Sequence, residues 1–202
     1  MDNFSVKQAL LDLLYVDVHL PKVVKDHPEF SSLINFIVDH KSLDDDEVSY
    51  PTIKEASQAT KMRYDRVRKQ IQKLYEIMFP FMDHKYLKFT KVKYELYFSY
   101  FGNMHYMLID QFPVPLKVGE NLTMPFLKAK LKTDRFYVAS IRHHFEKDLQ
   151  KIEVTLKGGD YNLFWHHRKD EAKEKREIAP ADFYRKEDFY LKKEIMGKNN
   201  GI

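Results

Sequence analysis

The chain of 202 residues has no cysteine, only 6 glycines and no long uncharged apolar run. Without cysteine it can form neither disulfides nor thiolate metal sites, and it has no cysteine nucleophile. With so little glycine, few loops could wrap a phosphate through backbone atoms alone. No apolar stretch reaches the ~20 residues that span a bilayer, and the first residues lack a signal-peptide pattern. We therefore expect a cytoplasmic protein that does not associate with membranes.

Catalytic signatures are also missing. The sequence contains no GxSxG nucleophile elbow, no glycine-rich phosphate loop, no dinucleotide fingerprint and no HExxH zinc motif. It therefore nominates no catalytic residue and no cofactor, and we expect a protein that is not an enzyme.

Two histidine pairs and one acidic run are the only hints of a metal site. His143-His144 and His166-His167 both fall in segments read as β-structure. Neighbouring residues of a strand point to opposite faces, so each pair could supply one ligand to a shared zinc ion. The acidic run at 44–47 lacks the glycine and the distal glutamate of a calcium loop. We expect no resident metal, and a metal-dependent hydrolase using His144 with His166 or His167 is a remote alternative.

The overall composition favours a folded protein with a small net charge. Hydrophobic residues make up 44% of the chain and aromatic residues 14%, which is typical of a folded core. The formal net charge is only +4, far from that of a histone-like polycation. Any affinity for nucleic acid must therefore come from a concentrated basic patch.

Such a patch lies within Tyr50–Phe79, which reads as a short helix, a tight turn and a longer basic helix. Thr52 followed three residues later by Glu55 is a capping box, which predicts a helix over residues 53–59. A second helix is predicted from Tyr64 to about residue 79, because apolar residues recur there every three or four positions. Pro80 ends it.

The stretch PTIKEASQATKMRYDRVRKQIQKLYE resembles the helix-turn-helix of bacterial transcription regulators. It departs from the common pattern at Lys61, where many members have glycine, and at Ser57, where alanine is usual. The resemblance implies that the second helix is a recognition helix that enters the major groove of DNA. It covers about residues 51–76 and specifies no target sequence.

We therefore expect a duplex-DNA-binding protein that acts in transcription regulation. Guanidinium groups contact phosphates bidentately and can read guanine edges, so the arginines of the second helix suit this task. A homodimer is expected, because one helix seldom supplies enough affinity alone. The predicted nucleic-acid-binding residues are Arg63, Tyr64, Arg66, Arg68, Lys69 and Lys73, with Arg68 and Lys73 assigned to the phosphate backbone.

The predicted fold class is α+β, in three segments. Residues 1–83 form a helical domain with the helix-turn-helix, including a first helix from Phe4 to about His19. Residues 84–178 form a β domain, predicted to be an antiparallel sheet or small barrel because Tyr86–Gly159 alternates with period two. Residues 179–202 form a charged and aromatic tail that docks on the body.

Several features of the second segment leave further interpretations open. A hairpin with its turn at Gly102-Asn103 follows the basic helix and could be the wing of a winged helix. A helix is predicted over Lys169–Glu177, where Glu171 and Lys175 have supportive spacing. The aromatic residues of the strands could stack single-stranded nucleic acid, or form the docking surface of a protein-interaction module that binds no nucleic acid. Those residues are Tyr97, Tyr100, Phe101, Tyr106, Phe136, Tyr137, Tyr161, Phe164 and Trp165, with Lys91, Lys93, Arg135 and Arg142 between them.

Overall fold

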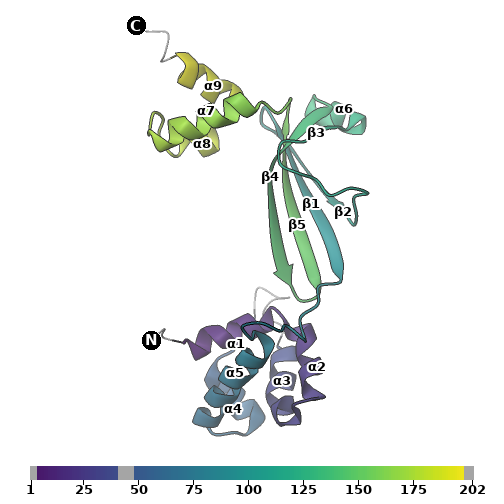
Figure 1. Ribbon diagram of the computed structural model, residues 1–202, viewed down its shortest axis with the longest axis vertical. Coiled ribbons are helices and arrows are strands. Elements are labelled where there is room, and N and C mark those ends of the chain that lie inside the picture. Colours follow the sequence, from purple (N-terminus) through teal and green to yellow (C-terminus); the bar gives the residue numbers. More distant parts are fainter. Residues whose placement is uncertain (1–3, 41–47, 198–202) are drawn as a thin grey trace. The chain divides into compact units, whose positions relative to one another are not determined.

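The computed structural model describes residues 4–40 and 48–197 of an α+β protein (Figure 1). The chain divides into two compact units. The first unit comprises Met1–Lys93 and His144–Lys151, and the second comprises Tyr94–His143 and Ile152–Ile202. The chain therefore leaves the helical first unit, returns to it for a short segment and leaves it again.

Two predicted features fall outside the ranges that the structure describes. The acidic run at 44–47 is one, and the end of the predicted tail, residues 198–202, is the other. Within 4–40 and 48–197, no helix combines the length and the apolar character needed to cross a bilayer.

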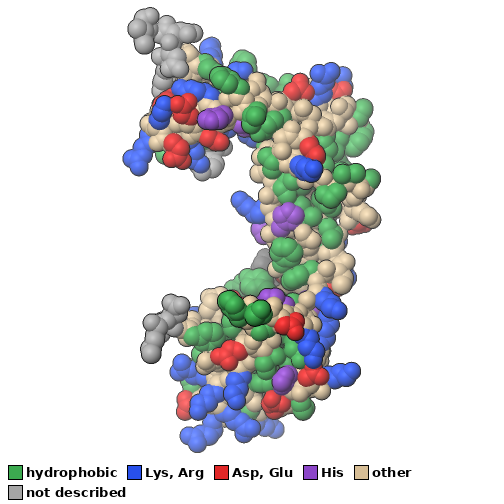
Figure 2. Space-filling model, viewed as in Figure 1, with side chains coloured by type: hydrophobic (Ala, Val, Ile, Leu, Met, Phe, Trp, Pro, Cys, Tyr) green, Lys and Arg blue, Asp and Glu red, His purple; other side chains and the backbone are tan. Residues whose placement is uncertain are grey.

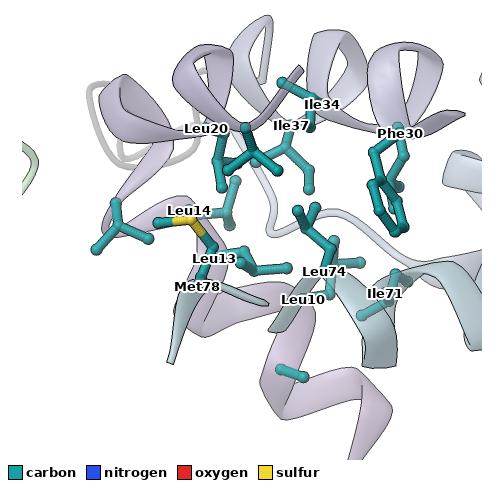
Figure 3. Packing of buried hydrophobic residues seen from close by; sticks show 14 of the residues in the cluster. Leu10, Leu13, Leu14, Leu20, Phe30, Ile34, Ile37, Ile71, Leu74 and Met78 are labelled. Atoms are coloured by element: carbon teal, nitrogen blue, oxygen red, sulfur yellow. The ribbon is translucent and has the colours of Figure 1, made fainter. Parts of the chain in front are cut away.

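The first unit is a helical assembly around a single apolar core, shown in Figure 3. Residues of α1, α3 and α5 that lie three or four positions apart face this core and are almost fully buried, as expected for amphipathic helices. The helices are α1 (Val6–Leu14), α2 (Leu20–Val24), α3 (Ser31–Val38), α4 (Ile53–Thr60) and α5 (Tyr64–Met78), with 3-10 turns at Asp17–His19 and Pro28–Phe30. The core includes Leu10, Leu13, Leu14, Phe30, Ile34, Ile37, Ile71, Leu74 and Met78.

The first helix is shorter than the predicted span from Phe4 to His19. It ends at Leu14, and a 3-10 turn and α2 follow. Val16 lies just past this end. Its side chain is β-branched, and such residues lose rotamer freedom in a helix, which disfavours a longer α1. Pro21 then occupies the first turn of α2, where its missing N–H leaves no hydrogen bond unmade.

The returning segment, His144–Lys151, is bonded into the helical unit. The backbone N–H of Lys147 donates to the carbonyl of Tyr15 at 2.6 Å, and its carbonyl lies 2.8 Å from Nε2 of His19. His19 is only 1% exposed, so this contact satisfies a buried imidazole nitrogen. The carboxylate of Asp148 accepts from both the backbone N–H and the hydroxyl of Thr90, which lowers the Asp148 pKa. A sheet hairpin is thereby part of the helical unit.

The strands form one sheet in the order β2-β1-β5-β4-β3. β1 pairs with β2, and β3 with β4, in antiparallel fashion. The N–H of Lys91 donates to the carbonyl of Asp148, where β1 and β5 begin, and Gly158 lies against Tyr100, where both end. These two strands therefore run parallel. The strands are β1 (Lys91–Tyr100), β2 (Asn103–Ile109), β3 (Asn121–Thr123), β4 (Arg135–Glu146) and β5 (Leu149–Gly158).

The predicted antiparallel sheet is therefore corrected to a mixed, open sheet, with β2 and β3 at its edges. Period-two alternation identified the strands but carries no information on which strands become neighbours. The predicted hairpin turn also moves by one residue. Phe101 and Gly102 occupy it, both with positive φ, and Tyr100 pairs with Asn103 across it. One sheet face packs into a core made with the short helix α6 (Lys128–Leu131).

The C-terminal part of the second unit is helical. The segments are α7 (Leu163–Glu174), α8 (Asp182–Arg185) and α9 (Asp188–Gly197). The predicted helix over Lys169–Glu177 begins earlier, because the side chain of Asn162 accepts from the N–H of Trp165 and caps the first turn. His166 and His167 accordingly lie on a helix, and their assignment to β-structure was wrong. Trp165, Ala172, Ile178, Leu191 and Ile195 form a small core of their own.

Candidate nucleic-acid interface

Helix α4 is fixed at its start by the predicted capping box. The Thr52 hydroxyl accepts from the N–H of Glu55 at 3.2 Å, and Glu55 Oε2 accepts from the N–H of Thr52 at 2.7 Å. The Thr52 N–H lowers the pKa of Glu55 because it stabilises the ionised carboxylate. The prediction of this box is confirmed, and the helix that it starts extends one residue further than predicted, to Thr60.

The turn between α4 and α5 is tight and its polar groups are bonded locally. Lys61 ends α4 in the left-handed conformation, with φ 55°. The Ser57 hydroxyl donates to the backbone carbonyl of Met62 at 2.6 Å, and the Thr60 hydroxyl donates to that of Ala56 at 2.6 Å. Ala56 is fully buried, which allows the close approach of the two helices. A lysine thus holds the backbone position at which the resembling regulators often have glycine.

Helix α5 is anchored by one row of apolar side chains. Val67, Ile71, Leu74 and Met78 are each fully buried in the core of the first unit. The row predicted for this helix is therefore confirmed. A helix held along one side presents its other faces to solvent in a fixed rotation about its axis.

The exposed faces of α5 and of its N-cap carry the predicted basic residues. Lys69 lies opposite the buried row, as follows from the helical period of 3.6 residues. Arg66 and Lys73 lie on one flank of Lys69, and Tyr64 and Arg68 lie on the other. Arg63 is the N-cap residue. All six predicted residues are exposed: Arg63, Tyr64, Arg66, Arg68, Lys69 and Lys73.

Within the part of the chain that the structure describes, these cations have no ion-pair partner. Among residues 4–40 and 48–197, no ion pair or side-chain hydrogen bond involves the arginines or lysines of the segment from Arg63 to Lys73. That segment holds five cations and one carboxylate, Asp65. Figure 2 shows Lys and Arg side chains gathered over α4 and α5 at the lower end of the helical unit. The result is a local positive surface on a rigid helix.

The other sequence candidates are scattered. Phe136, Tyr137 and Trp165 are at most 5% exposed and belong to the interior. Tyr97, Phe101 and Tyr106 are exposed. The hairpin considered as a wing, β1 with β2, is built into the five-stranded sheet. The described part of the chain holds no cluster of three potential metal-ligating side chains, and the two histidine pairs lie on β4 and α7.

A half-buried charge cluster in the second unit escaped the sequence reasoning. The carboxylate of Asp188, at the start of α9, accepts from Lys169 at 2.6 Å and from the Tyr137 hydroxyl at 2.8 Å. Lys157 lies 3.5 Å away. Burial alone would raise the pKa of Asp188, but these partners outweigh it and the pKa falls to about 2. Burial and the Asp188 charge raise the pKa of Tyr137.

The Asp188 carboxylate anchors the start of α9 to the rest of the second unit. Both carboxylate oxygens are engaged, so Asp188 is a charged tie between α9, α7 and the sheet. His166 stacks on Tyr161 with ring centroids 4.6 Å apart, and burial lowers its pKa. No local motif links these residues, because they come from elements far apart in the sequence.

Comparison with known proteins finds no match to this chain among family models, curated proteins or solved structures.

Proposed function

We propose that this protein binds duplex DNA through α5 and acts as a transcription regulator. The observation that carries the proposal is the row of exposed cations, without an ion-pair partner among the described residues, on a helix whose opposite side is fully buried. A cation without an internal partner can neutralise phosphate without first breaking an existing ion pair. The capped α4 and the tight turn support the proposal, because they restrict the position of α5.

The dimensions of α5 suit the major groove. Its 15 residues make a rod about 22 Å long, and a helix about 10–12 Å across fits a groove about 12 Å wide. We assign base-edge contacts to the N-terminal side chains and to the outward-facing Lys69, in line with how recognition helices enter DNA. Arg68 and Lys73, on opposite flanks, are assigned to the phosphates of the two strands. The base-edge group is Arg63, Tyr64, Arg66 and Lys69.

The proposal is tested by fluorescence anisotropy with random-sequence duplex DNA at low salt. Charge reversal at Arg63 and Arg66, both to glutamate, should abolish binding that the unmodified protein shows at micromolar concentration. In a matched control, two exposed lysines of the second unit, Lys117 and Lys130, are both replaced by glutamate, which changes the net charge by the same amount. Equal loss in both variants would mean that only net charge matters, and would contradict a specific role for α5.

A second candidate is a protein-interaction module that binds no nucleic acid. The observation in its favour is a set of exposed apolar side chains on β1 and β2, including Tyr97 and Tyr106. Absence of DNA binding at low salt, together with weak salt dependence of a protein contact, would favour this candidate.

A further inference from the structure

Strand β2 is an unusually open edge of the sheet. It is seven residues long and, among residues 4–40 and 48–197, has a partner strand on one side only, whereas the opposite edge strand, β3, has three residues. Edge strands present a row of unpaired backbone N–H and C=O groups that can bind another strand. A very short edge such as β3 is protected by its length, but β2 is not.

Three of the usual protections of an edge strand, charged side chains, proline and bulges, are missing from β2. The segment NMHYMLI contains no Lys, Arg, Asp, Glu or proline. Its pairing with β1 runs without a bulge from Tyr94–Ile109 to Tyr100–Asn103. Charged side chains, proline and bulges are the features with which proteins prevent strands from pairing at their edges. The edge is therefore regular and uncharged over its whole length.

The outward face of β2 is apolar as well. Met104, Tyr106 and Leu108 are 76%, 43% and 57% exposed. Tyr106 packs against Tyr97 of β1 with ring centroids 5.1 Å apart, which extends the surface across the hairpin. The side chains of Met107 and Ile109 point the other way, into the core beneath the sheet. A contiguous exposed apolar patch of this kind marks an interaction site.

We propose that β2 pairs antiparallel with β2 of a second copy of this chain, about a two-fold axis at Tyr106. This register is the one that pairs all seven residues. It sets Tyr106 against its own copy, Met104 against Leu108 of the second copy, and Asn103 against Ile109. Every exposed apolar side chain then meets another, and no charges are brought together. The match between the strand and itself selects a second copy over an unrelated strand.

Oligomeric state tests this inference without DNA, so its outcome is independent of the function proposed above. Sedimentation velocity of the full chain over a dilution series should show a monomer that dimerises as concentration rises. Tyr106→Lys places two cations at the axis and should leave a monomer at all concentrations. Phe126→Lys changes a side chain that is 71% exposed elsewhere in the unit and should leave dimerisation unchanged. A monomeric unmodified protein, or a dimer that survives Tyr106→Lys, would overturn the inference.

Engineered cysteines test the register directly, because the chain has no cysteine of its own. Opposed residues of antiparallel strands lie about 4.5–5.5 Å apart at Cα, within disulfide range. Under oxidation by diamide, Tyr106→Cys should form a linked dimer by itself. Met104→Cys and Leu108→Cys should each remain unlinked alone but link when mixed. Efficient linking of either one alone, or none from Tyr106→Cys, would exclude this pairing.

Discussion

Replacing Asp188 with asparagine should destabilise the second unit measurably. The Asp188 side chain is 20% exposed and is held by Lys169 and Tyr137. Its pKa of about 2 lies below the ordinary value of 3.8. At about 1.4 kcal/mol per pH unit, this difference contributes about 2 kcal/mol to the free energy of unfolding at neutral pH. Asparagine also leaves the Lys169 ammonium, 16% exposed, without its closest countercharge, which adds to the loss.

Thermal unfolding followed by circular dichroism measures this loss. For a chain of this size, about 2 kcal/mol corresponds to a fall in Tm of roughly 4–8 °C. Because the folded-state pKa of Asp188 is depressed, its stabilisation is complete above the unfolded pKa and is lost as pH falls toward about 2. The difference between the two proteins should therefore shrink to about half by pH 3.

A matched control is Asp182→Asn, which removes a carboxylate that is 33% exposed and lies 3.1 Å from Lys186. Lys186 keeps its second partner, Glu194, so the Tm should change little. An Asp188→Asn variant as stable as this control at pH 7 would refute the assignment of Asp188 as the anchor of α9. So would a stability difference from the unmodified protein that is the same at pH 3 and pH 7.

Four further substitutions test the local structure by their effects on the free energy of unfolding in urea. Thr52→Ala removes the α4 cap and should cost about 1 kcal/mol; no loss would contradict the capping box. Lys61→Gly should raise the free energy of unfolding by up to about 1 kcal/mol, because glycine adopts the left-handed conformation without strain. Lys69→Gly, in the middle of α5, should lower it by about 1 kcal/mol. Equal losses in these two variants would contradict the turn geometry. Gly158→Ala should cost about 1–3 kcal/mol, because its Cβ would lie 2.2 Å from the Tyr100 ring; a neutral result would contradict that contact.

The parts of the structure that follow from local signals were predictable. The Thr52–Glu55 spacing located the start of α4, and the row ending at Met78 located the buried side of α5. Both depend on residues within a few turns of one another, which is the range over which helix capping and amphipathic periodicity act.

The parts that depend on contacts between distant segments were not predictable. The parallel pairing of β1 with β5 joins strands that have the other three strands between them in the sequence, and the contact of His19 with Lys147 spans 128 positions. Asp188 reaches Tyr137 and Lys169 only after α7 and α9 fold together. The start of α7 was predicted too late for a local reason. The aromatic residues that follow the Asn162 cap have high strand propensity and were assigned to β-structure.

The central claim, that α5 binds DNA, is tested most directly by the salt dependence of binding. Affinity for random-sequence duplex DNA is measured by anisotropy from low to physiological salt, for the unmodified protein and for Lys73→Ala. Each phosphate that a cation neutralises contributes a slope of about −0.9 to the plot of log affinity against log salt. The account assigns Arg68 and Lys73 to phosphates, so it predicts a slope of about −2 for each bound chain of the unmodified protein and one about 1 unit shallower for Lys73→Ala. A flat plot, or an identical slope in both proteins, would contradict it.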